Sequence, residues 1–273
     1  NMGNALKDKG DLDAAIDNYK QGILHLPQDA KLHFNLGITL HLKGDTDAAI
    51  YSQERANRID ASFKPSQLFY RILNARKKRE KTRNISDEVD TSCYDMSLKP
   101  RLLVLNRPVE NGLLTYLQAK NKLDLSKVEN EPSFGNTKGS MYDLFKDDHS
   151  AIENVANDVT NILMDTFKSE IFILDSFFSI FGAGGGTAPH THITSYDKIP
   201  GLDLTKQKHS LVYYLSAGDQ DCCDPGILKL YEPADEILPK AGMITIFPAD
   251  RPHSSIYGGK TDRVIIGINF YTI

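Results

Sequence analysis

Residues 243–253 read Met-Ile-Thr-Ile-Phe-Pro-Ala-Asp-Arg-Pro-His, a short apolar run that a proline-containing turn ends just before a histidine. Similar runs, rich in β-branched and aromatic residues and separated by Gly, Pro and Asp, occupy residues 171–181, 209–216, 226–231 and 263–271. Short strands at this spacing are typical of a β-sandwich or a jelly roll. We therefore expect the region from residue 171 onward to adopt one of these two folds.

Three histidines and an arginine lie among these runs. His190 and His192 stand at i and i+2, which places both on one face if they share a strand. His253 follows the turn after residue 248, and Arg263 comes ten residues later. Three imidazoles leave about half of an octahedral metal sphere open, and a guanidinium suits a carboxylate. The pattern predicts a mononuclear metal site beside a site for an anionic co-substrate.

The segments before His190 predict the local backbone around this histidine and a helix upstream of it. Gly182, Gly184, Gly185 and Gly186 should let the backbone bend sharply and leave room for a ligand at the strand end. Farther upstream, the Ser150-x-x-Glu153 capping box predicts a helix up to about residue 167. Its apolar stripe indicates core packing: Ile152, Val155, Val159, Ile162 and Leu163.

The N-terminal region repeats with a period of 34 residues. The shift aligns Gly10-Asp11 with Gly44-Asp45 and residues 13–16 with residues 47–50. This period resembles the tetratricopeptide repeat over roughly residues 1–62, with Gln53 where the first unit has Tyr19. Since fewer than three repeats are seldom stable alone, we expect either further repeats upstream or support from the second domain.

These segments predict an α+β multidomain chain. Residues 1–83 should form an α-solenoid of tetratricopeptide-like repeats, capped by a helix from about residue 66. The capping residues would be Leu68, Phe69, Ile72 and Leu73. Residues 84–97 read as a polar linker, and residues 98–273 as the β-rich domain with flanking helices, beginning with a strand near residues 101–105.

Residues 172–272 resemble the double-stranded β-helix, a jelly roll, of the Fe(II)- and 2-oxoglutarate-dependent oxygenases, specifically the prolyl-hydroxylase-like branch. The segments that carry the resemblance fall in the order and rough spacing of that branch. They are residues 211–215, 226–230, Pro239 with Gly242, residues 246–247, His253 and residues 263–270.

The resemblance implies roles for individual residues. His190, His192 and His253 would bind Fe(II), whereas Arg263 and Tyr214 would hold the far carboxylate of 2-oxoglutarate. His192 departs from the family, which has an aspartate at this position. Asp197 is an alternative third ligand, although it begins a loop over residues 198–208 that we interpret as a solvated lid over the site.

The implied activity is that of a dioxygenase that hydroxylates a C–H bond, with the repeats presenting a protein or peptide substrate of the prolyl type. Two alternatives stay open. One is a cupin-like metal-dependent oxygenase that does not use 2-oxoglutarate, and the other is a non-catalytic repeat adaptor with a vestigial metal site. A requirement for Arg263 as an anion clamp would distinguish the 2-oxoglutarate-dependent dioxygenase from the cupin-like oxygenase. The metal content of the purified protein would distinguish it from the non-catalytic adaptor.

The composition narrows the class of partner. A net charge of −4 argues against nucleic acid and anionic membranes as partners. There is no apolar run of about 18 residues, and three cysteines favour a reducing compartment, so we expect a cytoplasmic protein; its oligomeric state is not predicted.

Several other residues have ordinary interpretations. Cys222-Cys223 is read as part of an acidic turn, His209 as a core or rim residue, and the basic run 76–79 as a solvated helix face. Asn269 could line the pocket or serve as a structural amide.

Overall fold

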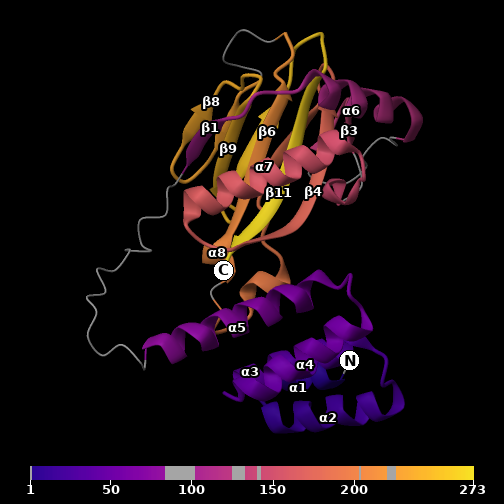
Figure 1. Ribbon diagram of the computed structural model, residues 1–273, viewed down its shortest axis with the longest axis vertical. Helices are drawn as coiled ribbons and strands as arrows, with labels where there is room; N and C mark the ends of the chain where they lie inside the picture. The colour runs from indigo at the N-terminus through magenta and orange to yellow at the C-terminus, as the bar shows by residue number, and fades with distance from the viewer. Residues whose placement is uncertain (1, 84–101, 125–132, 140–142, 203, 220–225) are drawn as a thin grey trace. The chain divides into compact units, whose positions relative to one another are not determined.

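The computed structural model describes residues 2–83, 102–124, 133–139, 143–202, 204–219 and 226–273 (Figure 1). Within these residues the chain forms two compact units. The first contains the helices of residues 2–83 with residues 198–202, and the second contains both β-sheets. The predicted linker over residues 84–97 lies outside the described residues, so the predicted domain boundaries stay a prediction. No helix among the described residues is long and apolar enough to cross a membrane.

The first unit is a series of helices whose ends follow from the sequence repeat. Gly10 and Gly44 take left-handed φ values of 84° and 92°, which ends one helix, and the next residue caps the following helix. Asp11 accepts a hydrogen bond from the Ala14 backbone nitrogen at 3.2 Å, and Asp45 from that of Ala48 at 3.0 Å. The helices are α1 (Met2–Asp8), α2 (Leu12–His25), α3 (Ala30–Leu42), α4 (Thr46–Ile59) and α5 (Lys64–Arg83).

The two repeats differ at Tyr19 and Gln53, and α5 supplies a hydrogen-bond donor to the glutamine. Tyr19 is fully buried in the first repeat, and its hydroxyl donates to Asn4. Gln53, its equivalent, is also fully buried; its amide nitrogen donates to the Phe34 carbonyl at 3.1 Å, and its amide oxygen accepts from the Ser66 hydroxyl at 2.9 Å. The four apolar residues expected to cap the stack are buried as well: Leu68, Phe69, Ile72 and Leu73.

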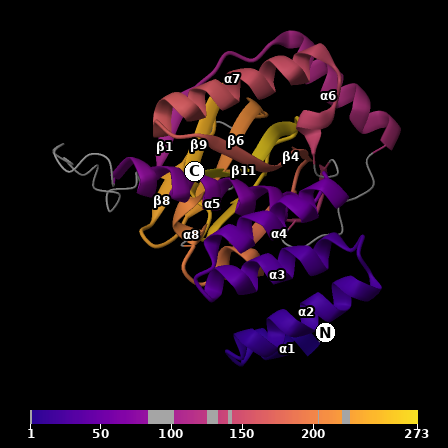
Figure 2. The same cartoon turned by 60° about the horizontal axis from the view of Figure 1, so that its bottom comes forward.

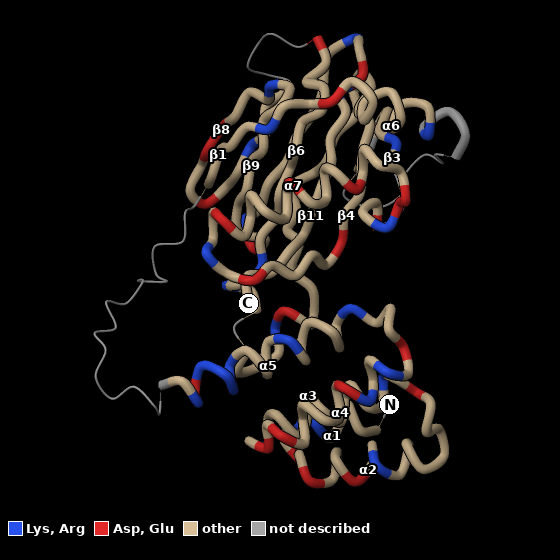
Figure 3. The backbone as a smooth tube through the Cα atoms, viewed as in Figure 1, with Lys and Arg blue, Asp and Glu red and all other residues tan. Residues whose placement is uncertain are grey.

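Lys and Arg residues are concentrated in the second half of α5 (Figure 3). Lys77 pairs with Asp47 of α4, and Lys78 and Arg79 are exposed. These two exposed residues agree with the solvated face predicted for this run.

The second unit consists of two antiparallel sheets. The six-stranded sheet has the order β1-β9-β6-β11-β4-β3, and the five-stranded sheet β2-β5-β10-β7-β8. The strands of the larger sheet are β1 (Leu103–Asn106), β3 (Thr137–Gly139), β4 (Ile171–Phe181), β6 (Lys208–Ser216), β9 (Met243–Pro248) and β11 (Arg263–Thr272). Those of the smaller sheet are β2 (Ser133–Phe134), β5 (Gly186–His190), β7 (Leu228–Leu230), β8 (Asp235–Ile237) and β10 (His253–Ile256). This arrangement confirms the predicted jelly roll, with each of the five apolar runs forming a strand.

Short helices and one long helix complete this unit. They are α6 (Asn111–Asp124), η1 (Leu144–Lys146), α7 (Ser150–Phe167), η2 (Ser195–Lys198) and α8 (Leu204–Gln207). The predicted capping box of α7 was wrong by one residue. His149 has an extended backbone and caps the helix instead, because its Nδ1 accepts a hydrogen bond from the Ala151 backbone nitrogen at 3.2 Å.

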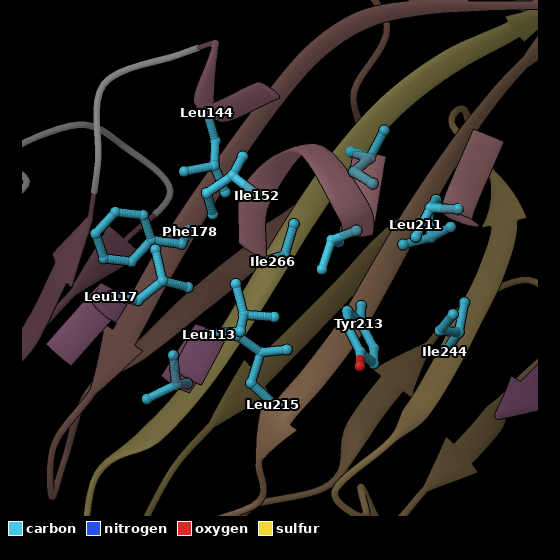
Figure 4. Close-up of a cluster of buried hydrophobic side chains, with 14 of the residues drawn as sticks. Leu113, Leu117, Leu144, Ile152, Phe178, Leu211, Tyr213, Leu215, Ile244 and Ile266 are labelled. Carbon is cyan, nitrogen blue, oxygen red and sulfur yellow. The ribbon is translucent and has the colours of Figure 1, made fainter. Parts of the chain in front are cut away.

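Helix α7 covers the outer face of the larger sheet (Figures 1 and 2). Its apolar stripe meets the side chains that alternate outward from β6, β9 and β11, and together they form one core cluster (Figure 4). Ile152, Val155, Val159 and Leu163 are fully buried there, and each contributes about 1.5–3 kcal/mol by burial. Because side chains alternate along a strand, the residues between these core positions face the inside of the jelly roll. Tyr214 and Arg263 belong to this inner set, with Val212 packing between the sheets.

The glycines before His190 allow a close approach of two loops. A Cβ on Gly185 would lie 2.6 Å from the backbone oxygen of Asn136, and one on Gly182 would clash with the Asn136 side chain. Gly184 has a φ of 75°, which supplies the predicted bend. The room expected for a ligand at Gly182 and Gly185 is therefore filled by the turn at Asn136.

Replacing Gly185 with alanine should lower the free energy of unfolding by about 1–3 kcal/mol, because a backbone oxygen cannot move aside as a side chain can. Urea denaturation measures this change. Gly112→Ala in α6 is the control, because no atom lies within 4 Å of the position that its added methyl group would take. That variant should be neutral or gain up to about 1 kcal/mol. Equal stabilities for the two variants would contradict the close approach.

Candidate metal centre

The three histidines meet where β5 and β10 pair. His190 ends β5, His253 begins β10, and the two residues lie directly opposite each other in the antiparallel register. Opposite residues of a pair point to the same side of a sheet. His192 lies just beyond the end of β5, and its backbone nitrogen donates to the Ala249 carbonyl at 2.8 Å. The structure thus brings the three predicted ligands together from two neighbouring strands and one turn.

The spacing of the imidazoles fits a single ion. One ligand atom from each histidine can be chosen so that all three lie within 4.8 Å of one another. The Nε2 atoms of His192 and His253 are 3.3 Å apart, and the ring centroids of His190 and His253 are separated by 4.3 Å. The distance between these two Nε2 atoms is roughly that between two nitrogens that bind the same ion, each at about 2.1 Å. In the part of the chain that the structure describes, no other group of His, Cys, Asp and Glu has this spacing.

Backbone carbonyls orient two of the rings. Nδ1 of His190 lies 2.8 Å from the Ala188 carbonyl, and Nδ1 of His253 lies 3.3 Å from the Arg251 carbonyl. A carbonyl can only accept, so each Nδ1 carries the proton and each Nε2 keeps its lone pair. This tautomer is the one in which Nε2 is ready to bind a metal.

The surroundings keep the imidazoles neutral. Burial lowers the pKa of His192 to about 2, with further lowering from the neighbouring histidines and Lys208. Burial also lowers the pKa of His253 to about 3, and it lowers the pKa of His190. A neutral imidazole is the form that binds a metal, so these shifts favour a ligand set that does not have to lose protons near neutral pH.

Arg263 is a buried cation on the inner face with an unused donor. It is 2% exposed, its Nη1 donates to the Gly226 carbonyl at 2.8 Å and its Nε to the Ala217 carbonyl at 3.2 Å. Its guanidinium lies 4.5 Å from the centre of the Tyr257 ring. Among the described residues, the buried third nitrogen, Nη2, has no hydrogen-bond partner, and no carboxylate pairs with this arginine. A buried guanidinium with a free N–H is the group that a carboxylate ligand would satisfy.

Tyr214 lies on the strand next to Arg263. In the register of β6 and β11 it stands opposite Ile265, two residues from Arg263, and it is 3% exposed. Burial raises the pKa of its phenol, and the charge of Arg263 opposes this shift. The phenol therefore stays protonated and can donate a hydrogen bond. The structure brings Tyr214 and Arg263 together, and their role as a carboxylate clamp stays a prediction.

Asp197, the alternative third ligand, is engaged elsewhere. It is 2% exposed, and its Oδ2 accepts from the Thr194 backbone nitrogen at 2.6 Å and from Lys208 Nζ at 2.9 Å. Its Oδ1 accepts from the Tyr271 hydroxyl. Burial by itself would raise the pKa of this carboxyl, but the hydrogen bonds from Tyr271 and Lys208 hold it below its usual value. With both oxygens occupied, Asp197 is not placed as a metal ligand.

The solvated lid predicted over residues 198–208 is exposed only in part among the residues described there: Lys198, Pro200, Gly201 and Lys206 are exposed, whereas three others are buried. Leu202 is fully buried, Leu204 is 2% exposed and Lys208 is 1% exposed. The apolar side chains and the ion pair of Lys208 with Asp197 account for this burial. The burial of Lys208 could not be predicted from the sequence, because a lysine at the start of a strand ordinarily lies in solvent.

The remaining candidates have structural positions. The His209 ring packs between Phe167 and Phe270, with ring centroids 4.7 and 5.3 Å away, as expected of a core residue. Asn269 donates to Asp175 at 2.7 Å and accepts from Ser210 at 2.8 Å, which agrees with the structural-amide interpretation. Cys222 and Cys223 lie outside the described residues.

Comparison with protein families identifies the helical unit. A family described as TPR repeat matches residues 3–44, and one described as tetratricopeptide repeat matches residues 30–63. The helices of residues 3–63 are tetratricopeptide repeats. A comparison with curated proteins found no match.

Comparison with solved structures identifies the fold of the second unit. A prolyl hydroxylase from Trichoplax adhaerens, in complex with a hypoxia inducible factor peptide fragment, matches with a TM-score of 0.50 and 13% identity. The match covers 72% of this chain and 93% of that one. The second unit has the fold of the prolyl-hydroxylase-like 2-oxoglutarate oxygenases.

Two further solved structures are similar but carry no weight in this assignment. A collagen prolyl hydroxylase of Paramecium bursaria Chlorella virus-1 has a TM-score of 0.49 and 12% identity, covering 66% of this chain and 99% of that one. A prolyl-4-hydroxylase of Pseudomonas putida has a TM-score of 0.46 and 15% identity, covering 66% and 96%. At these identities, function has to be argued from the site itself.

Proposed function

We propose that this chain is an Fe(II)- and 2-oxoglutarate-dependent dioxygenase that hydroxylates a C–H bond. One observation carries the proposal: three neutral histidines, of which His253 is buried and the other two are partly exposed, share a jelly roll with a buried, inward-facing arginine whose Nη2 has no partner among the described residues. The first group suits a divalent metal, and the second suits a carboxylate. A co-substrate that chelates a metal at one end and carries a carboxylate at the other would use both.

The three histidines would hold Fe(II) through their Nε2 atoms. When bound, iron with 2-oxoglutarate supplies the activation of dioxygen that C–H hydroxylation requires. The carbonyls of Ala188 and Arg251 keep the rings of His190 and His253 in the metal-binding tautomer. Because His192 replaces a carboxylate, the protein ligands carry no charge, and an anionic co-substrate would compensate the charge of the metal.

Arg263 and Tyr214 would bind the far carboxylate. Arg263 already donates to two backbone carbonyls, so its orientation is set before an anion arrives. The Tyr257 ring against its face excludes water from one side of the guanidinium. This arrangement favours use of 2-oxoglutarate over the cupin-like alternative, which would leave the Nη2 of Arg263 without a partner among the described residues.

The substrate that we propose is a protein or peptide, of the prolyl type. Tetratricopeptide repeats offer extended surfaces for peptide segments, and the Trichoplax structure contains a bound peptide fragment. The repeats would then bind the substrate protein, and the metal centre would act on one of its side chains.

Turnover of 2-oxoglutarate tests the proposal. Protein purified without oxygen and loaded with Fe(II) should convert 2-oxoglutarate to succinate when oxygen is admitted, even slowly in the absence of a second substrate. Succinate is measured directly, with metal-free protein as the control. Iron bound in stoichiometric amount without succinate would favour the cupin-like alternative, and absence of stoichiometric iron would favour the non-catalytic adaptor.

A further inference from the structure

A buried ion pair lies next to the metal centre without belonging to it. Lys208, the first residue of β6, and Asp197, in η2, are joined by a contact of 2.9 Å, and their side chains are 1% and 0% exposed. Removing two charges from water is costly, and a pair of apolar side chains often gives equal or greater stability. Such a pair therefore calls for a role beyond holding the fold together.

The Asp197 carboxylate organises the turn that follows His192. It accepts hydrogen bonds from both the backbone nitrogen and the hydroxyl of Thr194, at 2.6 and 2.8 Å. The Asp197 backbone nitrogen donates back to the Thr194 carbonyl at 3.2 Å, which closes the turn. Tyr271 of β11 donates its hydroxyl to the other carboxylate oxygen. The turn is thereby attached to two central strands of the larger sheet, β6 and β11.

Lys208 also connects to the other side of His192. The Lys208 carbonyl accepts from the Ala249 backbone nitrogen at 3.1 Å, and the Ala249 carbonyl accepts from the His192 backbone nitrogen at 2.8 Å. One residue thus supports the backbone of His192 through Ala249 and the turn after His192 through Asp197. His192 needs such support more than His190 and His253 do, because it alone lies outside a strand.

We propose that Asp197, Lys208 and Tyr271 form a positioning network that holds the His192 imidazole in place for the metal. The inference rests on the metal centre of the proposed function. The network acts through the backbone on both sides of His192 and does not touch the ion. Asp197 also neutralises Lys208, so that no unpaired ammonium lies beside a divalent cation.

The effect of Lys208 on its surroundings agrees with this arrangement. Burial is the main cause of the lowered pKa of His192, and the charge of Lys208 adds to it. Without the Asp197 carboxylate, the same charge would oppose metal binding.

Tyr271→Phe is the mild variant that tests the network. It removes one hydroxyl that donates to Asp197 and leaves both charges in place. The matched control is Tyr116→Phe, because the Tyr116 hydroxyl donates to another carboxylate of the same unit, Asp147, at 2.8 and 2.9 Å. Asp197→Asn is the stronger variant, since it removes the charge.

The readouts are the affinity for Co²⁺, measured by titration of the full metal-free chain, and the visible spectrum of bound Co²⁺, which reports ligand geometry. Tyr271→Phe should weaken Co²⁺ binding about tenfold and Asp197→Asn up to about 100-fold, with altered spectra, as expected for groups that orient metal ligands. Tyr116→Phe should leave affinity and spectrum as in the wild type, whatever it does to the melting temperature.

Three results would overturn the network, and one would overturn only the proposed function. The network is wrong if Tyr271→Phe keeps the wild-type affinity and spectrum, or if Tyr116→Phe changes both to the same extent. A wild-type chain that binds no Co²⁺ removes the metal centre itself and the network with it. If instead Co²⁺ binding depends on Tyr271 but the Fe(II) protein forms no succinate, the network stands and the proposed dioxygenase activity falls.

Discussion

Protein in which His253 is replaced by alanine should lose stoichiometric Fe(II) when it is purified without oxygen. His253 is 6% exposed, and its ring lies within 5.0 Å of both other imidazole rings, centroid to centroid. Two neutral imidazoles would remain, one of them outside a strand. We expect the affinity for iron to fall by more than about 100-fold, beyond the loss typical of a group that merely orients a ligand. Metal analysis and Co²⁺ titration measure the change.

His25→Ala is the control for this loss, because His25 is exposed at the end of α2 and lies in the helical unit. It should bind as much iron as the wild type. If His253→Ala also retained one iron per chain, the ion would be bound elsewhere, and the three histidines would have a structural role.

Arg263→Gln should weaken the binding of 2-oxoglutarate by about 30-fold or more. Truncating one partner of a buried, hydrogen-bonded charge pair costs about 2–5 kcal/mol, and each 1.4 kcal/mol is a factor of about ten in affinity. The glutamine carries no charge and cannot present N–H groups from two nitrogens side by side to a carboxylate. Calorimetric titration of Co²⁺-loaded protein with 2-oxoglutarate measures the effect, and binding of Co²⁺ itself should not change.

The matched control is Arg107→Gln, another buried arginine of the same unit. Arg107 is 5% exposed, and Asp158 and Glu110 already pair with it, so no vacant N–H marks it as an anion site. This variant should lose stability, while its folded fraction keeps the wild-type affinity for 2-oxoglutarate. Equal losses of affinity in both variants would mean that the effect is general, and normal affinity in Arg263→Gln would exclude Arg263 as the clamp.

Much of the fold could be predicted because it depends on local sequence patterns. The repeated Gly-Asp pairs mark helix ends, and the β-branched runs mark strands, since each depends on residues close together in the sequence. The three histidines could be proposed as a group because two of them stand at i and i+2. The third follows a strand and a turn. Such local patterns predict structure well because they determine which side of a helix or strand faces the core.

The groups around the site could not be predicted, for a physical reason. Asp197 and Lys208 are polar residues of a segment that looks solvated, and only their ion pair makes burial tolerable. Tyr257, which lies against Arg263, follows the end of β10 and is not part of a periodic sequence pattern. Such contacts join distant segments in space and leave no repeat or spacing in the sequence.

The placement of β11 has a consequence for the biosynthesis of the protein. Its residues 263–272 lie between β4 and β6 in the larger sheet, although residues 171–181 and 208–216 leave the ribosome much earlier. Until β11 arrives, two long apolar strands have an unpaired edge, which is a hazard for aggregation. All three histidines emerge before Arg263. We therefore expect the jelly roll to close only after β11 has been translated, and the facing edges of β4 and β6 to stay unpaired in the nascent chain until then.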